Sequence, residues 1–123
     1  ALETCRKNGF KVTVTVLDRT GRTRVVLHDD NTPPHTIENS YRKAWTALTF
    51  RQPSGDIGKR MAQQPGIPQP QLLLANVTSA EGALPIKAGD EIVGSMGVSG
   101  APGGDKDEVC SNAGIAKVAS KLK

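Results

Sequence analysis

The stretch that most constrains this chain runs from Gly82 to Gly104. Its first part predicts a β-hairpin, with an apolar strand at 84–86, a Gly-Asp turn within 87–90 and a second strand at 91–99. Gly94 and Gly97 interrupt the second strand, and such glycines are typical of a bulge or of close approach by another backbone or a ligand. We therefore expect the other elements to pack around this hairpin and to leave a recess that suits a flat ligand.

Two further strands are predicted near the start of the chain. Residues 12–16 alternate valine with threonine, which indicates a half-buried strand with its valines inward and its threonines outward. A turn at 18–21 leads to the partner strand at 23–28.

Helices are predicted at 1–8, from Thr36 to about residue 51, at 54–64 with Ser54 as its cap, and at 105–122, with a short buried turn or helix at 72–74. Apolar residues of the two long helices recur at helical spacing. These stripes are Ile37, Tyr41, Ala44, Trp45 and Leu48 in one helix, and Val109, Ala113, Ala116 and Ala119 in the other.

This order of elements indicates one α+β domain over residues 1–123, with an antiparallel sheet whose two outer helices share a face. The first helix lacks the start that its pattern would lead us to expect, so we expect that upstream residues were trimmed. No stretch approaches the ~20 apolar residues of a membrane-spanning helix. The net charge of +4 permits anionic partners, but the 3% of aromatic residues are not interleaved with basic ones, so nucleic-acid binding is not expected.

The two cysteines, Cys5 and Cys110, lie at opposite ends of the chain. They either form a disulfide, which would suit a periplasmic or secreted protein, or remain buried thiols in a reducing cytoplasm. Their spacing excludes a CxxC redox or zinc motif.

Enzyme motifs are largely missing from the sequence. Residues 97–101 do not fit the nucleophile elbow, because position 101 is alanine, and residues 100–104 lack the lysine of a phosphate-binding loop. The latter glycines could hold an anion at a helix N-terminus, although a tight turn explains them more simply. His28 and His35, seven residues apart, are either ordinary loop histidines or ligands of a metal or haem iron.

Several segments resemble the GlcG/HbpS-like family. They are Val14 to Asp18 with Gly21, His35 to Glu38, Lys43 to Ala47 with Phe50, Gly82 to Ile86, and Glu91 to Gly100 followed by Asp107-Glu108. Ala83, where members often carry glycine, and the shortened first helix depart from the family pattern. The resemblance implies a profilin-like α+β fold with a five-stranded antiparallel sheet flanked by helices. It also implies homo-oligomers that bind haem or a corrinoid.

For a haem ligand, His35 and then His28 are the candidates to bind the iron. A groove with Tyr41 and Trp45 would suit the ring, and Arg42, Lys43 or Arg51 would suit the propionates; alternatively, the two aromatic residues belong to the core or to a subunit interface. Three functions follow from this resemblance. The chain is a small-molecule binding protein for transport, storage or sensing, or an enzyme that acts on a small metabolite or degrades haem with His35 and Glu38 as acid–base groups, or an accessory protein without a cofactor.

Overall fold

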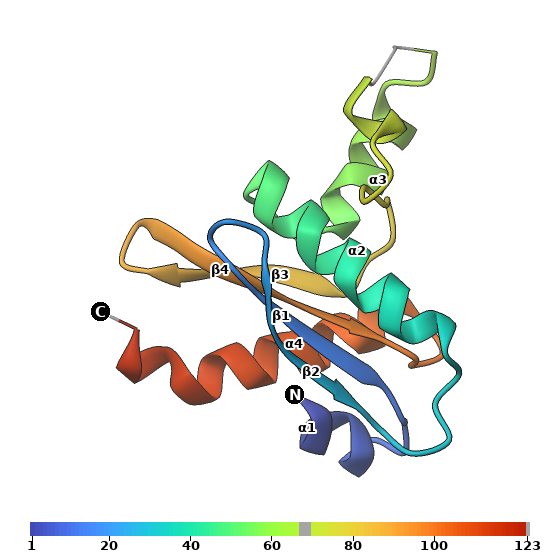
Figure 1. Cartoon of the computed structure of the whole chain (residues 1–123). Helices are drawn as coiled ribbons and strands as arrows, with labels where there is room; N and C mark the ends of the chain where they lie inside the picture. Colours follow the sequence, from blue (N-terminus) through green and yellow to red (C-terminus); the bar gives the residue numbers. More distant parts are fainter. Residues whose placement is uncertain (67–69, 123) are drawn as a thin grey trace.

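A four-stranded antiparallel sheet with the strand order β2-β1-β4-β3 forms the centre of the molecule (Figure 1). The computed structural model describes residues 1–66 and 70–122. Its strands are β1 (Thr13–Asp18), β2 (Thr23–His28), β3 (Ala83–Ala88) and β4 (Glu91–Ser99). All four were predicted from the residues, and the α+β class is confirmed.

The expected fifth strand is not found in the described part of the chain. The segment that leads into β3 is held by side chains of a helix instead of a neighbouring strand: Arg42 donates to the Val77 carbonyl, and the Thr78 N–H donates to Thr46 Oγ1. The count of five came from the family resemblance, whereas the residue pattern predicted four.

Helices cover both faces of the sheet (Figure 1). On one face lie α2 (His35–Phe50) and, beyond it, α3 (Gly55–Gln63). On the other face α1 (Leu2–Lys7) and α4 (Gly104–Val118) lie together, as predicted for the outer helices. Short 3₁₀ turns occupy Pro70–Leu73 and Ala119–Lys121. Within the described residues, no helix is long and apolar enough to cross a membrane.

A disulfide between Cys5 and Cys110 joins α1 to α4, with 5.6 Å between the two Cα atoms. Both cysteines are fully buried beside Val12, Val14 and Val98, which form the core on this face. Of the two alternatives that the sequence left open, the structure therefore contains the bridge. The first helix ends where predicted, because Gly9 adopts a φ of 86° that turns the chain out of the helix.

Gly97 allows the backbone of α2 to lie directly against β4. A Cβ atom at position 97 would collide with the Ser40 carbonyl oxygen and would lie 2.8 Å from the Ala44 nitrogen. The close approach predicted for this strand is thus made by another part of the chain. At Gly97 itself, α2 fills the space beside the hairpin.

The predicted burial of β1 was wrong for its threonines. Thr13 and Thr15 are fully buried beneath α2, because helices cover both sides of this strand. Their hydroxyl groups are hydrogen-bonded to Thr36 and Ser40 of α2. The interface between α2 and the sheet is therefore rich in paired hydroxyl groups rather than in hydrocarbon.

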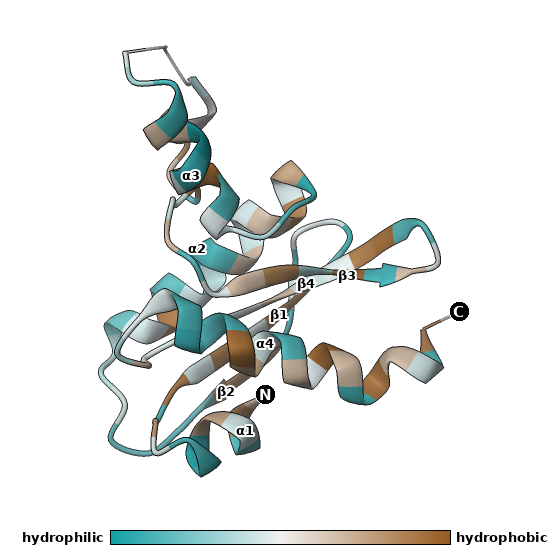
Figure 2. Ribbon diagram, turned by 180° about the vertical axis from the view of Figure 1, so that it is seen from behind, coloured by the Kyte–Doolittle hydropathy of each residue, from teal (hydrophilic) through white to brown (hydrophobic). Residues whose placement is uncertain are grey.

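The two apolar helix stripes are only partly buried, since Ala44 is fully buried but most of the other members are not. Ile37 is 44% exposed and Val109 is 55% exposed, and hydrophobic segments are visible along the outside of α4 (Figure 2). Leu73 and Leu74, expected in a buried turn, are exposed. Ser54 does not cap α3 through its side chain, because its hydroxyl accepts the Ala83 N–H of β3.

Candidate functional site

A chain of hydrogen bonds connects His28, at the end of β2, to the start of α2. The Nδ1 atom of His28 lies 2.6 Å from Thr13 Oγ1, which lies 2.7 Å from Thr36 Oγ1. Thr36 in turn donates to the Pro33 carbonyl over 2.7 Å. We call this chain of four residues the His28 relay.

The relay determines which nitrogen of His28 carries the proton. A carbonyl can only accept, so the single hydroxyl proton of Thr36 is used on Pro33, and Thr13 must donate its own proton to Thr36. Every contact in the chain then has one proton only if His28 donates from Nδ1 to Thr13. In the neutral ring the Nε2 atom then keeps its lone pair, and the residue is exposed at the edge of the sheet. A histidine fixed in this way through its other nitrogen is the usual arrangement of a metal ligand.

His35, the first residue of α2, is exposed and lines a hollow of about 290 Å³. The opposite wall is the loop from Ser99 to the start of α4, and Lys43 and Asp107 lie at the bottom. The glycines of this loop are needed for its close packing, since a Cβ atom on Gly104 would lie 2.6 Å from the Glu81 carbonyl oxygen. The structure thus brings His28 and His35 to the same end of α2, because His35 precedes the relay residue Thr36.

Lys43 is not available to a bound anion. Its Nζ atom donates to Asp107 Oδ2 over 2.9 Å and to the Val98 carbonyl over 3.0 Å, and both partners of the ion pair are buried. Burial raises the pKa of Asp107, and the hydrogen bond from Lys43 opposes that rise. Arg42 is also engaged, since its Nη2 donates to the Val77 carbonyl.

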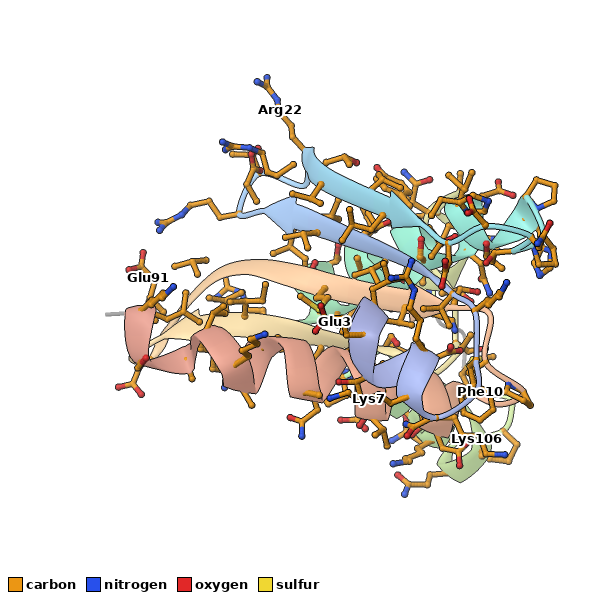
Figure 3. The ribbon with its side chains drawn as sticks, turned by 90° about the horizontal axis from the view of Figure 1, so that it is seen from below. Glu3, Lys7, Phe10, Arg22, Glu91 and Lys106 are labelled. Carbon is orange, nitrogen blue, oxygen red and sulfur yellow. A yellow bond between two sulfur atoms is a disulfide. The ribbon has the colours of Figure 1, made fainter. Side chains whose placement is uncertain are left out.

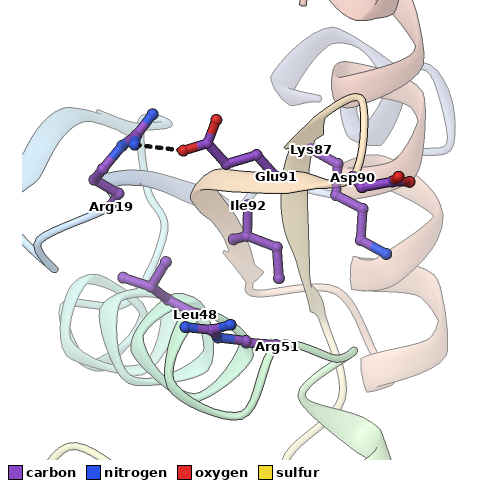
Figure 4. A pocket seen from close by; sticks show the side chains of 7 residues that line it. All are labelled: Arg19, Leu48, Arg51, Lys87, Asp90, Glu91 and Ile92. Atoms are coloured by element: carbon purple, nitrogen blue, oxygen red, sulfur yellow. Dashed lines mark hydrogen bonds and ion pairs between the residues drawn. The ribbon is translucent and has the colours of Figure 1, made fainter.

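Arg51, the third cation considered for a propionate, lines a different hollow of about 560 Å³ (Figure 4). Leu48 and Ile92 supply apolar walls there, and Arg19 forms an ion pair with Glu91 over 2.7 Å. Arg51 follows the last residue of α2, while His35 is the first. At a rise of 1.5 Å per residue their backbones lie about 24 Å apart along the helix axis, at opposite ends of α2.

Tyr41 and Trp45 lie on the side of α2 that faces β2, in a row that we call the α2 flank: Ile37, Tyr41, Trp45 and Leu48. This orientation follows because the opposite side of the helix bonds to segments near β3, and because the Trp45 indole lies against Gly21 in the β1–β2 turn. The flank is partly exposed, so it belongs to the surface rather than to the core.

Sequence reasoning missed both the relay and the buried ion pair. One signal was present: Thr36, Ser40, Lys43 and Ala47 recur at the same helical spacing as the apolar stripe, and they form the face that meets the sheet. The pairing of Lys43 with Asp107 had no local signal. Within residues 1–66 and 70–122, no group of three or more His, Cys, Asp and Glu side chains could hold a metal ion.

The sheet, its helices on both faces and the histidines at one end of α2 define a small α+β domain with an exposed histidine edge. The sequence model of the family described as "Haem degrading protein HbpS-like" matches residues 1–116. The chain belongs to this HbpS-like family.

Solved structures agree with this assignment. A crystal structure of HbpS is 36% identical with a TM-score of 0.86, and the match covers 95% of this chain and 80% of that one. A double mutant of HbpS from Streptomyces reticuli is 35% identical with a TM-score of 0.85, over 94% of this chain and 77% of that one. A complex of PduOC with haem shares the fold at 22% identity and a TM-score of 0.84, over 94% and 83% of the two chains. No match was found among curated proteins.

Proposed function

We propose that this chain binds haem and that Nε2 of His28 is the protein ligand to the iron. The observation that carries the proposal is the His28 relay, which leaves an exposed imidazole nitrogen with a free lone pair in a fixed orientation. Membership of a family named for haem supports the same ligand. His35, preferred from the sequence, becomes the second candidate, because it has no comparable anchor among the hydrogen bonds of the described residues.

The side chains near His28 suit the haem ring and its iron better than they suit the two propionates. Neutral imidazole is a common axial ligand of haem, and the α2 flank offers aromatic and aliphatic surface nearby. Lys43 and Arg42 are engaged with other partners, and Arg51 lies at the opposite end of α2 from the relay residue Thr36. We therefore expect the propionates to reach solvent or a cation from outside this chain. A corrinoid is the alternative ligand, since its cobalt also accepts imidazole.

A haemin titration tests this proposal. The parent protein and His35→Ala should shift the Soret band in the same way, whereas His28→Ala should lose the shift. Thr36→Val should weaken binding several-fold, because Thr13 can then donate its proton to His28 Nδ1, and the ring proton is no longer kept away from Nε2. A parent protein that gives no shift, or a His28→Ala variant that binds like the parent, overturns the proposal. Parallel titration with a cobalamin distinguishes the corrinoid.

Haem degradation is a second candidate function, favoured by the description of the family model. The groups considered for acid–base work, His35 and Glu38, are both exposed on the first turn of α2, where bulk water competes for any proton they transfer. Time-dependent bleaching of the haem complex with a reductant and oxygen would establish degradation, and a stable complex would exclude it. Transport, storage and sensing all require the stable complex.

The Cys5–Cys110 disulfide is compatible with an oxidising compartment, and we propose a periplasmic or secreted location. The cytoplasm is the alternative. Mass spectrometry of the protein isolated under non-reducing conditions tests this, because the bridged chain weighs about 2 Da less than the dithiol. A free dithiol in freshly isolated protein would contradict the proposed location.

A further inference from the structure

The hollow of about 560 Å³ at the C-terminal end of α2 has no part in the proposed haem site (Figure 4). It lies between the end of this helix, the tip of the β3–β4 hairpin and the β1–β2 turn. Leu48 and Ile92 give it aliphatic walls, and its charged side chains are those of Arg19, Arg51, Lys87, Asp90 and Glu91. A hollow of this size with an apolar wall and a few polar groups is typical of a small-molecule site.

Arg51 occupies a backbone position that favours glycine. It follows the last residue of α2 with a φ of 58° and a ψ of 39°, and its N–H donates to the Ala47 carbonyl. Glycine is the usual residue at such a left-handed helix end, because a Cβ atom opposes the conformation. Among the described residues, Asn31 is the only other non-glycine residue with a positive φ. The backbone thus gains nothing from an arginine here, so the side chain itself must account for it.

The Arg51 side chain extends into the hollow, beside Leu48 and below Ile92 (Figure 4). Within residues 1–66 and 70–122, its guanidinium group forms no ion pair. One acid of the hollow, Glu91, is bound by Arg19 over 2.7 Å, and the Asp90 carboxylate points away from Arg51 (Figure 4). A guanidinium group without an acidic partner can bind a carboxylate through two parallel hydrogen bonds.

Lys87 adds a second cation on the same side of the hairpin. It lies opposite Ile92 in the pairing of β3 with β4, and residues directly opposite each other share a face of the sheet. Both side chains point toward the end of α2 (Figure 4). Three basic and two acidic residues leave the hollow with one net positive charge. A single carboxylate matches that charge, and the aliphatic walls match an apolar body attached to it.

We propose that this hollow binds a small monocarboxylate with an aliphatic body. Arg51 donates two hydrogen bonds to the carboxylate, Lys87 adds attraction, and the body lies across Leu48 and Ile92. The carbonyl end of α2 repels an anion, so binding depends on the guanidinium group. Because water reaches the charged groups, we expect an affinity in the millimolar range.

Binding is measured from the amide chemical shifts of isotope-labelled, haem-free protein during titration with hexanoate. Signals of residues 48–51 and 87–92 should shift and saturate. Acetate has the carboxylate without the chain and should bind about tenfold more weakly, whereas hexanol has the chain without the charge and should give no saturable shift. A parent protein without saturable shifts in these residues overturns the proposal, as does binding of acetate or hexanol that equals that of hexanoate.

Arg51→Gly distinguishes an arginine that binds a ligand from one that serves the fold. Hexanoate binding should weaken about tenfold or more, whereas the midpoint of thermal unfolding should not fall, because glycine suits this backbone. Arg51→Lys keeps the charge but not the planar fork, and it should weaken binding several-fold. Unchanged affinity or a lower midpoint for Arg51→Gly overturns the proposal.

The matched control is Arg22→Ala. Arg22 is exposed and extends away from the sheet (Figure 3), so its loss removes the same charge from outside the hollow and should leave hexanoate binding unchanged. If Arg22→Ala weakens binding as much as Arg51→Gly, net charge alone attracts the anion and the proposal fails.

These measurements stand apart from the haemin titration, because they use haem-free protein. His28→Ala should bind hexanoate like the parent, since the His28 relay meets α2 at its other end. A lost Soret shift therefore leaves the carboxylate site in place, and absence of hexanoate binding leaves the haem proposal in place.

Discussion

The Lys43 Nζ atom lies 2.9 Å from Asp107 Oδ2, and the two side chains are only 4% and 3% exposed. The pair joins α2 to α4, which otherwise lie on opposite faces of the sheet. Lys43 also donates to the Val98 carbonyl, and Asp107 accepts the Ala101 N–H. The pair therefore holds the loop before α4, the end of β4 and both helix layers in one arrangement.

Replacing Lys43 by Met should lower the free energy of unfolding by about 3–5 kcal/mol at neutral pH, because it leaves the Asp107 carboxylate buried without its partner. The double variant Lys43→Met with Asp107→Leu should lose less than the sum of the single losses. Urea unfolding measures both. As a control, Lys59→Met breaks an exposed pair of 3.8 Å and should change stability by about 0.5 kcal/mol or less. Additive losses in the cycle would contradict a coupled pair.

Gly97→Ala should destabilise the fold by about 2 kcal/mol or more, since the new methyl group meets the backbone of α2 rather than a side chain that can move. Gly89→Ala in the same hairpin is the control. No atom lies within 4 Å of a Cβ atom there, so only its φ of 63° opposes alanine, at a cost of about 1 kcal/mol. Thermal unfolding of the two variants separates them. Equal losses would show that α2 can move away from β4.

Stability should fall on acidification through the pair of Arg6 and Asp29. The two hydrogen bonds from Arg6, each 2.9 Å, hold the pKa of Asp29 below its ordinary value of 3.8, although burial opposes the shift. The unfolded chain then binds the proton more tightly, so this contribution is complete above about pH 4 and is lost as the pH falls through the lower, folded-state value. Asp29→Asn should flatten the loss of stability between pH 5 and pH 2, as should Arg6→Met. A profile that neither variant changes would exclude this pair as the cause.

The Cys5–Cys110 bridge closes a loop over a separation of 105 residues, for which chain entropy gives a stabilisation of about 4–5 kcal/mol. Reduction of the parent should therefore lower the midpoint of urea unfolding strongly. The double variant Cys5→Ala with Cys110→Ala should unfold near the reduced parent and should not respond to the reductant. An oxidised parent no more stable than the double variant would contradict a structural role for the bridge.

The boundaries of most elements followed from local chemistry and could be predicted. Gly9 ends α1, Gly21 lies in the β1–β2 turn and Gly89 lies in the hairpin, and each has a positive φ that few other residues adopt readily. These signals depend on residues adjacent in sequence. They locate the turns whatever packs on the elements between them.

Which face of an element is buried was predicted less well, because packing partners decide it. Apolar periodicity left open whether the stripe of α2 faces the core, another subunit or a ligand. Gly97 brings the helix so close to β4 that only small residues such as Ser40 and Ala44 fit between them. The histidines show the same limit. Residue type and closeness in sequence predicted both histidines as candidates. The preference for His28 depends on its contact with Thr13 and on the contact of Thr13 with Thr36, and both contacts join residues far apart in sequence.

The hydroxyl pairs under α2 have a mechanical meaning. A helix packed through apolar side chains can shift along a sheet at little cost in free energy, because one methyl contact replaces another. A hydroxyl donor that shifts by one residue no longer faces its acceptor. The hydrogen bonds of Thr13 with Thr36 and of Thr15 with Ser40 therefore fix α2 in a single position on the sheet. His28 is bonded to one of these threonines, so its ring is held in one orientation before any ligand binds. A ligand then loses less free energy to ordering of the side chain.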